Sequence, residues 1–307
     1  MKKTLTRENF AKAFGEETSV LVEKKIDAYD FSYQHLSSLE KNEIILNILK
    51  TIDNPPGISG EHRINVWEKG WKENCDEIAS NKNFDSLIPK YFGKFPYVRW
   101  EKEIIKPLNK DFEYNMVQVL QYWLFEKYFS HVDNIYEFGC GTGHNLFRAS
   151  EVNPSANIYG LDWAKSSQDT LREINKVFDK NFNYHNFDFF NIDTDFKISE
   201  NSGIYTFAAL EQVGTNHKNF VDYLIENNCR ICLHIEPISE LLDYENDIND
   251  NLSVKYFKAR NYLNSFYKYL CELESQNKIK ILQKTPSFIG SQYINGYSIV
   301  AWEIKNA

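Results

Sequence analysis

Three glycines and one acidic residue form the first feature of this sequence that could bind a ligand. Residues 134–145 read Asn-Ile-Tyr-Glu-Phe-Gly-Cys-Gly-Thr-Gly-His-Asn. The apolar start of this run predicts a strand and the residues after it predict a helix, so the glycines lie in a tight turn between the two. Because glycine reaches positive φ angles and has no Cβ, the bare backbone of such a turn can approach a ligand closely. The unpaired N–H groups of the following helix then face the same ligand.

The spacing of the glycines distinguishes two classes of nucleotide ligand. A dinucleotide-binding fingerprint has the form G-x-G-x-x-G, and His144 occupies the place of its third glycine. Residues 137–143 instead have the form E-x-G-x-G-x-G. This form resembles the first motif of class I S-adenosylmethionine-dependent methyltransferases, in which the loop wraps the methionine end of the cofactor. The resemblance assigns cofactor contacts to Glu137, Gly139, Gly141, Gly143 and Asn145.

The chain downstream of this loop alternates between strand and helix patterns. We predict strands at residues 134–139, 157–162, 183–188, 204–210, 230–236, 279–285 and 297–304. We predict helices near residues 143–152, 166–178, 217–227 and 254–276. Strands separated by helices are typical of an α/β fold with a parallel, doubly wound sheet. The resemblance implies a Rossmann-like, seven-stranded methyltransferase sheet with an N-terminal helical cap, in which the last strand lies antiparallel between the fifth and sixth.

The ends of the second and third predicted strands carry acidic and aromatic residues. Asp162 ends the second strand, where a carboxylate can accept hydrogen bonds from both hydroxyls of a ribose, and Trp163 could pack on adenine. Asp162 could instead cap the following helix. Asp188 and Phe189 end the third strand and resemble the adenine-binding pair of the family. Together with Leu210 in the fourth strand, these residues complete the predicted cofactor site.

Polar residues near the ends of the fourth and fifth strands are the candidate general bases. Methyl transfer is an in-line displacement, and a hydroxyl acceptor must also lose its proton. Ligands of such sheets bind at the carboxyl ends of the strands, so the base is expected there. The candidates, each of which could also be a core residue, are Glu211, His217, His234 and Glu236.

Two further segments could form the acceptor pocket. Residues 64–106 are rich in aromatic and basic residues and contain prolines, which predicts an irregular segment with short helices that covers the cofactor. A packed cap or a dimer surface is the alternative interpretation of this segment. The other segment is an insertion at residues 239–278, acidic in its first part and helical in its second. The candidate acceptor contacts are Arg99, Trp100, Arg260 and Tyr267.

The N-terminal segment lacks a chemical motif of its own. Apolar residues from Val22 to Leu36 recur at helical spacing, which predicts a helix. The capping-box pattern of residues 37–40 begins a second helix, and the prolines of residues 54–57 end it. We therefore predict a mainly helical cap or lid region at residues 1–115 and a methyltransferase domain, with the insertion, at residues 116–307.

Composition and charge limit the partners of the protein. The formal net charge of −8 argues against electrostatic binding to nucleic acid. The sequence lacks the apolar core of a signal peptide and any apolar run long enough to span a membrane, so we expect a cytoplasmic protein with no membrane partner. Five scattered cysteines, an odd number, favour reduced thiols over a disulfide framework.

The aromatic segment, the helix start at residues 112–114 and the glycine loop together resemble bacterial enzymes assigned to O-methylation of sugars and surface polysaccharides. The resemblance implies a small-molecule or glycan acceptor, methylation of a sugar hydroxyl, and S-adenosyl-L-homocysteine as the product. No catalytic metal is expected, because a convincing set of acidic and histidine ligands is lacking. Two alternatives stay open, namely methylation of a protein or peptide side chain and a non-catalytic S-adenosylmethionine-binding partner subunit. We also expect a homodimer formed through the N-terminal region.

Overall fold

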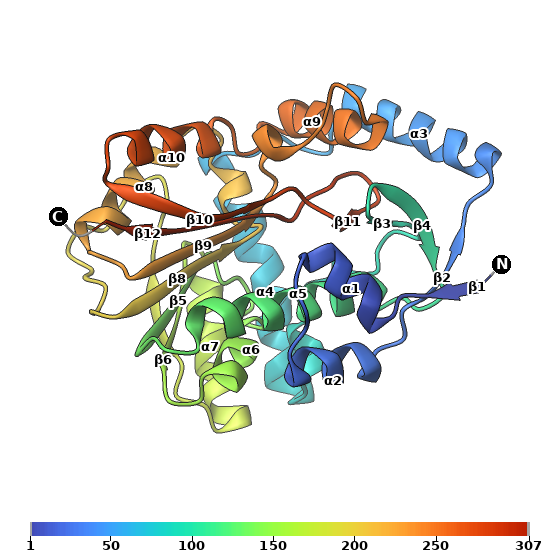
Figure 1. The fold of residues 1–307 in the computed structure, drawn as a ribbon. Coiled ribbons are helices and arrows are strands. Elements are labelled where there is room, and N and C mark those ends of the chain that lie inside the picture. Colours follow the sequence, from blue (N-terminus) through green and yellow to red (C-terminus); the bar gives the residue numbers. More distant parts are fainter. Residues whose placement is uncertain (1, 306–307) are drawn as a thin grey trace.

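Seven strands form the central sheet of the protein (Figure 1). The computed structural model describes residues 2–305. The strands of this sheet are β5 (Asn134–Phe138), β6 (Asn157–Asp162), β7 (Asn183–Asn186), β8 (Ser202–Phe207), β9 (Ile231–Glu236), β10 (Ile279–Thr285) and β12 (Ser298–Ile304). Their order is β10-β12-β9-β8-β5-β6-β7; the pairs among β5 to β9 are parallel, and β12 is antiparallel to both of its neighbours. The predicted doubly wound sheet, with its antiparallel last strand, is confirmed.

Helices cover both faces of this sheet, as Figure 1 shows. Alternate residues of a strand point to opposite faces, and Ile135 and Tyr136 of β5 accordingly belong to different apolar clusters. The cluster of Ile135 includes α5 (Phe112–Phe129), α6 (Leu146–Val152) and α7 (Lys165–Phe178). The cluster of Tyr136 includes α8 (Lys218–Glu226) and α10 (Phe266–Ser275). Two packed layers thus hold the carboxyl ends of the parallel strands in fixed positions.

The N-terminal segment contributes to a second sheet of five short antiparallel strands. These are β1 (Lys2–Thr4), β2 (Ser32–His35), β3 (Val98–Trp100), β4 (Glu103–Pro107) and β11 (Ile289–Ser291). The helices of the segment are α1 (Arg7–Phe14), α2 (Val20–Ala28), α3 (Ser38–Asp53) and α4 (Ile64–Asn81). Because β11 pairs with β3, the N-terminal and C-terminal parts of the chain share this sheet.

Two helix predictions in this segment have different outcomes. The helix predicted over residues 22–36 is wrong in its second half, because α2 ends at Ala28 and residues 32–35 form β2. The hydrogen bonds of β2 come from β1 and β4, which lie far away in the sequence, so local spacing does not reveal them. The predicted capping box is confirmed, since the Ser37 hydroxyl accepts from the backbone of Glu40 and the Glu40 carboxylate accepts from the backbone of Ser37.

The insertion at residues 239–278 forms two helices where we predicted one at 254–276. α9 (Ile248–Arg260) ends at Asn261, which has a left-handed φ of 53°, and α10 begins after Ser265, which has a φ of 60°. Leu252 of α9 packs against Ile44 and Ile48 of α3, so α9 joins the N-terminal segment while α10 covers the sheet. Figure 1 shows α3 and α9 side by side. The break between the helices directs α9 over the mouth of the site described below.

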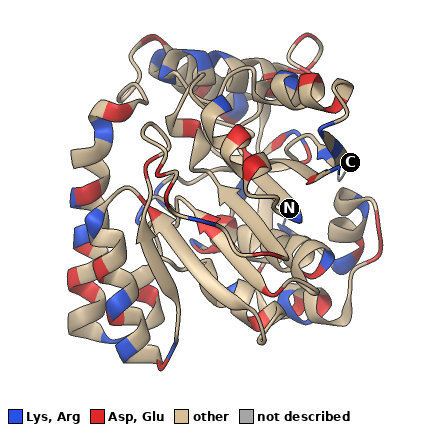
Figure 2. Cartoon of the chain, turned by 90° about the vertical axis from the view of Figure 1, so that its left-hand side faces the viewer, with Lys and Arg blue, Asp and Glu red and all other residues tan. Residues whose placement is uncertain are grey.

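Charged residues concentrate on the outer helices. Figure 2 shows both signs interspersed along these helices, while the strands of the sheet carry few charges. No helix within residues 2–305 is long and apolar enough to cross a membrane. Few charged side chains are buried, and three of them, Glu113, Asp162 and Arg260, line the site described below.

Candidate active site

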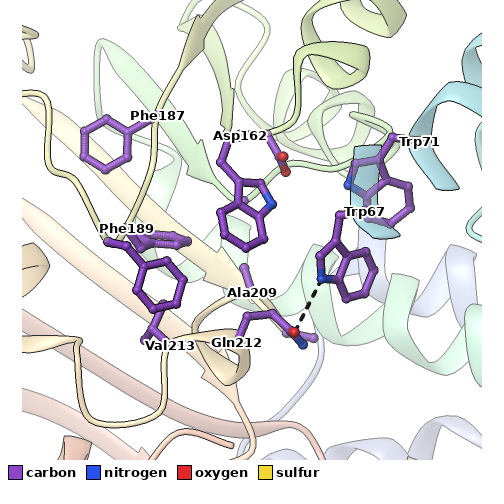
Figure 3. A pocket seen from close by; sticks show the side chains of 12 residues that line it. Trp67, Trp71, Asp162, Phe187, Phe189, Ala209, Gln212 and Val213 are labelled. Atoms are coloured by element: carbon purple, nitrogen blue, oxygen red, sulfur yellow. Dashed lines mark hydrogen bonds between the residues drawn. The ribbon is translucent and has the colours of Figure 1, made fainter. Parts of the chain in front are cut away.

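Two adjoining cavities lie at the carboxyl ends of β5, β6 and β8. The first is narrow and aromatic, and Figure 3 shows the side chains around it. The second has a volume of about 270 Å³ and is lined by aromatic and charged side chains. Gly139, Ala208 and Gln212 line both cavities, as do Trp67 and Trp71 of α4. A ligand that occupies both cavities would therefore pass over Gly139.

The glycine loop supplies the floor between the cavities. Gly139 and Gly141 have φ angles of 80° and 54°, in the left-handed region where a side chain is disfavoured. A Cβ at Gly139 would overlap that of Ala209, and a Cβ at Gly141 would lie 2.9 Å from the ring of Trp71. Gly143 lines neither cavity and instead gives room to Leu171 of α7. Two glycines shape the cavity floor and the third allows the helix to pack.

Asp162 and Trp163 line the first cavity. The two oxygens of the buried Asp162 carboxylate accept from the backbone N–H groups of Gly141 and Ala164, each at 2.9 Å. Burial raises its pKa to about 6, and the two backbone hydrogen bonds oppose this rise. Figure 3 shows the carboxylate directed toward the space between the aromatic side chains. Asp162 thus holds the glycine loop and retains acceptor capacity for a ligand.

The third strand contributes Phe189 to the first cavity but not Asp188. The Asp188 carboxylate accepts from the backbone of Phe190 and from the side chain of Asn191, both at 2.9 Å. It closes a local turn and lines neither cavity. The ring of Phe190 instead stacks with Trp163, with centroids 5.7 Å apart. The structure therefore places the aromatic member of the predicted adenine-binding pair at the cavity and leaves the acid outside it.

A buried polar network lies behind the glycine loop. The Glu137 carboxylate accepts from Asn145 Nδ2 at 2.7 Å and from the Tyr205 hydroxyl at 2.9 Å, and burial raises its pKa to about 8. Asn145 Oδ1 in turn accepts from Gln121 and from Arg148. Only Asn145 of this network lines a cavity, so Glu137 supports the loop from behind. Leu210, predicted as a cofactor contact, is fully buried and lines neither cavity.

Of the four candidate bases, only Glu211 lines a cavity. Glu236 is buried and accepts from the backbone N–H groups of residues 209, 210 and 211 at 3.0 to 3.3 Å, so it fixes the turn that carries Glu211. His234 lies within hydrogen-bonding distance of Thr206 Oγ1, and burial lowers its pKa to about 3. His217 contacts the carbonyl oxygen of Asn264. The structure places these three residues in supporting positions.

The environment of Glu211 suits proton abstraction. Burial raises its pKa to about 7, while the positive charge of Arg260 opposes this rise. Gln212 Nε2 donates to its carboxylate at 2.8 Å. A general base is most effective when its pKa lies near the working pH. Glu211 and Glu113, whose pKa burial also raises to about 7, are the two acids of the larger cavity that could remove a proton from a hydroxyl there.

Helix α4 covers both cavities. We predicted an irregular segment with short helices here, but residues 64–81 form one helix because the prolines of the segment begin only at Pro89. Trp67 Nε1 donates to Gln212 Oε1 at 3.4 Å, as Figure 3 shows. The Glu68 carboxylate accepts from the backbone N–H of Ser166, and the Ser166 hydroxyl donates to the Glu68 carbonyl oxygen. Glu68 thus ties α4 to the N-terminal turn of α7.

Glu68→Ala should lower the free energy of unfolding by about 1 kcal/mol, the usual cost of losing an acceptor at a helix N-terminus. Urea denaturation followed by circular dichroism measures this change. Glu73→Ala is the matched control on the same helix, because Glu73 is exposed and only forms a surface ion pair with Lys90. Equal changes for the two variants would contradict the role that we assign to Glu68.

Three of the predicted acceptor contacts lie away from the cavities. Arg99 is fully buried and donates to the carbonyl oxygens of Asn249 and Tyr293, so it joins β3 to α9. Trp100 packs edge-on against the ring of Phe10. Tyr267 lies on α10 outside both cavities, whereas Arg260 lines the larger one. The cavity also contains residues that we did not predict as contacts: Arg63, Tyr91, Glu113, His144, Tyr256 and Tyr297.

Comparisons with known proteins were made on sequence and on structure. No protein family model matches the sequence, and no curated protein matches it. Among solved structures, the plantazolicin methyltransferase BpumL in complex with SAH is 14% identical, with 80% of this chain and 99% of that chain covered and a TM-score of 0.44. The O-methyltransferase NcsB1 from neocarzinostatin biosynthesis, in complex with S-adenosylmethionine, is 13% identical (63% and 58% covered, TM-score 0.42). Human N-acetylserotonin methyltransferase in complex with SAM is 13% identical (64% and 57%, TM-score 0.41).

The chain thus spans less than two thirds of the length of the last two of these proteins. The fold itself rests on the topology of the central sheet. Its strand order, with β12 antiparallel between β9 and β10, is the order that the resemblance implied. The chain has the fold of class I S-adenosylmethionine-dependent methyltransferases.

Proposed function

We propose that the protein is an S-adenosylmethionine-dependent methyltransferase that methylates a hydroxyl group of a small molecule, with a sugar as the acceptor. The observation that carries this proposal is the meeting of two cavities at Gly139. One cavity has aromatic walls and the Asp162 carboxylate, which suits an adenosine. The other contains Glu211, a partly buried acid with a pKa of about 7. A methyl donor and a proton acceptor are thereby placed on either side of one junction.

The polar atoms around the glycine loop fit the methionine end of the cofactor. The Thr142 hydroxyl donates to the Leu87 carbonyl oxygen at 2.6 Å, so it accepts from His144 Nδ1–H at 3.1 Å. Burial lowers the pKa of His144 well below its usual value, which keeps the ring neutral. Its Nε2 lone pair is then a buried acceptor without a partner among the described residues. Such an acceptor beside the loop suits an ammonium group.

The reaction needs alignment and the removal of one proton. S-adenosylmethionine supplies a methyl group on a sulfonium, which leaves as the neutral thioether of S-adenosylhomocysteine. The acceptor oxygen forms a bond to the methyl carbon as the carbon–sulfur bond breaks, and the hydroxyl proton passes to the Glu211 carboxylate. Glu236 holds the turn of Glu211 through three backbone hydrogen bonds, and Trp67 and Trp71 exclude water from above.

Two features of the larger cavity argue against the alternative functions, namely methylation of a protein side chain and cofactor binding without catalysis. A protein acceptor with a basic side chain would meet Arg63 and Arg260, whose charges repel it. The acidic residues of the insertion that would attract such an acceptor do not line the cavity. A non-catalytic binding subunit has no need of an acid with a pKa near 7 in the cavity beside the glycine loop. The enzyme with a small acceptor is therefore the function that the site supports best.

Isothermal titration calorimetry with S-adenosylmethionine, S-adenosylhomocysteine and NAD tests the proposal. We expect both sulfur compounds to bind and NAD not to bind, because residues 137–143 and Asp162 form a site without the dinucleotide glycine spacing. Binding of NAD alone, or no binding at all, would show that the glycine loop has another ligand. Transfer of a labelled methyl group from the bound cofactor to sugars then tests the acceptor class.

A further inference from the structure

Two arginines in the larger cavity have donors without an acceptor. Arg260 is 8% exposed, and within residues 2–305 its only side-chain hydrogen bond is from Nη1 to the Tyr256 hydroxyl at 3.0 Å. Its Nε is buried and without a partner among residues 2–305. Arg63 Nε is likewise buried and without a partner, and within the same residues Arg63 has no ion pair. Both side chains line the cavity, and Arg260 Nη2 and both Nη atoms of Arg63 form no hydrogen bond within the described residues, so these terminal donors are available to a ligand there.

The fold brings these two arginines together from distant parts of the chain. Arg63 precedes α4, and Arg260 ends α9. The backbone N–H of Ser59 donates to the Arg260 carbonyl oxygen at 2.7 Å, and Asn261 Nδ2 donates to the Ser59 carbonyl oxygen. Gly57 leaves room for the guanidinium, because a Cβ there would overlap Arg63 Nη1. The loop before α4 is therefore anchored to the C-terminus of α9, and Arg63 and Arg260 line the same cavity.

Unpaired guanidinium donors are costly in a buried position. A guanidinium carries five N–H donors, and a buried charge without hydrogen-bond partners loses hydration that nothing replaces. The rings of Tyr256 and Tyr262 lie 5.7 and 5.2 Å from the Arg260 guanidinium carbon and compensate only in part. A bound carboxylate or phosphate would satisfy the remaining donors with charge-assisted hydrogen bonds.

The acids of the cavity do not replace that anion. Glu211 and Glu113 line the same cavity, but neither forms an ion pair with Arg63 or Arg260 within the described residues. Burial raises the pKa of each acid to about 7, so each is partly protonated at neutral pH. Glu113 also accepts from the Tyr297 hydroxyl at 3.3 Å. The charges of Arg260 and Arg63 oppose the rise in the pKa of Glu211, but without an ion pair to an acid within the described residues their terminal donors remain for an anion.

We propose that the methyl acceptor is an acidic sugar whose carboxylate or phosphate binds Arg63 and Arg260 while one of its hydroxyls faces Glu211. This inference rests on the proposed function and names its substrate class. The cavity walls also include the rings of Tyr256 and Tyr293, which stack at 5.7 Å, and flat aromatic faces of this kind can pack against sugar rings. A cavity of about 270 Å³ has room for a single sugar and excludes a long glycan chain.

Calorimetric titration of the full-length protein tests this inference with glucuronate, glucose 6-phosphate and glucose. Each probe is titrated with and without saturating S-adenosylhomocysteine. We expect at least one acidic probe to bind about tenfold or more tightly than glucose, because charge-assisted hydrogen bonds carry the difference. The two acidic probes distinguish a carboxylate from a phosphate acceptor. Equal affinities for all three, or no binding of either acidic probe, would overturn the inference.

The variants Arg63→Gln and Arg260→Gln should each weaken binding of the preferred acidic probe by about tenfold or more, with little change for glucose. Arg172→Gln on α7 is the control, because Arg172 is exposed and pairs only with Asp169 and Tyr184. Unchanged affinity in both cavity variants would contradict the role of the arginines. Binding of S-adenosylhomocysteine, measured in the same samples, reports correct folding. If S-adenosylhomocysteine does not bind to the wild-type protein, the proposed function is refuted. The probe titrations made without S-adenosylhomocysteine still test the anion site in that case.

Discussion

Glu211→Gln is expected to lower kcat by about 10²- to 10⁴-fold, the usual contribution of a general base. Glutamine keeps the shape of the side chain and its hydrogen bond with Gln212, but it cannot accept the proton of the acceptor hydroxyl. The affinity for S-adenosylmethionine should stay within about threefold of the wild type, because glutamine keeps the size and the hydrogen bond of the side chain. Single-turnover transfer of a labelled methyl group measures the effect, and calorimetry measures the affinity.

The pH profile provides a second measurement on the same residue. Glu211 must be ionised to act as a base, so kcat/KM should rise with pH and level off above its pKa of about 7. The glutamine variant should lose this dependence. Glu240→Gln is the matched control, because Glu240 is an exposed acid that lines neither cavity. A variant of Glu211 with wild-type turnover, or a wild-type profile that is flat around pH 7, would exclude Glu211 as the base.

Asp162→Ala should weaken the binding of S-adenosylmethionine by about 1–3 kcal/mol, roughly 5- to 150-fold, the scale of lost hydrogen bonds to a charged group. The carboxylate lines the adenosine side of the junction, and it also holds the backbone of Gly141 and Ala164. The substitution therefore removes a ligand contact and also loosens the glycine loop, and both effects weaken cofactor binding. Asp162→Asn retains one carbonyl oxygen as an acceptor and should lose less affinity than the alanine variant.

Asp188→Ala is the control for this experiment and also tests the adenine-binding pair. Because the Asp188 carboxylate closes its own turn and lines neither cavity, its loss should change the affinity by less than about threefold. Calorimetric titration of the three variants with S-adenosylhomocysteine gives the comparison. Unchanged affinity in Asp162→Ala would remove this residue from the cofactor site. A large loss of affinity in Asp188→Ala would instead assign Asp188 to the cofactor site.

The positions of the strong local signals were predictable from the sequence. The glycine loop, the acid that ends β6 and the alternation of strands and helices each depend on residues within one or two neighbouring elements. The parallel sheet then places Gly139, Asp162 and Glu211 at one edge, because the carboxyl ends of its strands meet there. Even the antiparallel β12 agrees with the resemblance. For these residues, local pattern and global fold point to the same arrangement.

Which polar residues face the cavities was decided by packing alone. Glu211 and Glu236 follow similar strand ends, yet Glu236 turns inward to bind three backbone N–H groups and only Glu211 reaches the cavity. Arg99 and Arg260 both lie in segments predicted to contact the acceptor. The guanidinium of Arg99, however, donates its hydrogen bonds to carbonyl oxygens of α9 and of the C-terminal loop. Hydrogen-bond partners of this kind come from distant segments, so no local pattern distinguishes the two outcomes.

The sequence by itself determined the fold class, the cofactor loop and the edge of the sheet where chemistry occurs, because hydrophobic periodicity and glycine spacing encode them locally. The tertiary structure decided the character of the acceptor cavity. Arg63 and Arg260 line one cavity because the loop before α4 packs on the end of α9, and neither forms an ion pair within the described residues. Contacts between segments so far apart depend on the whole packed fold, which no single stretch of residues specifies.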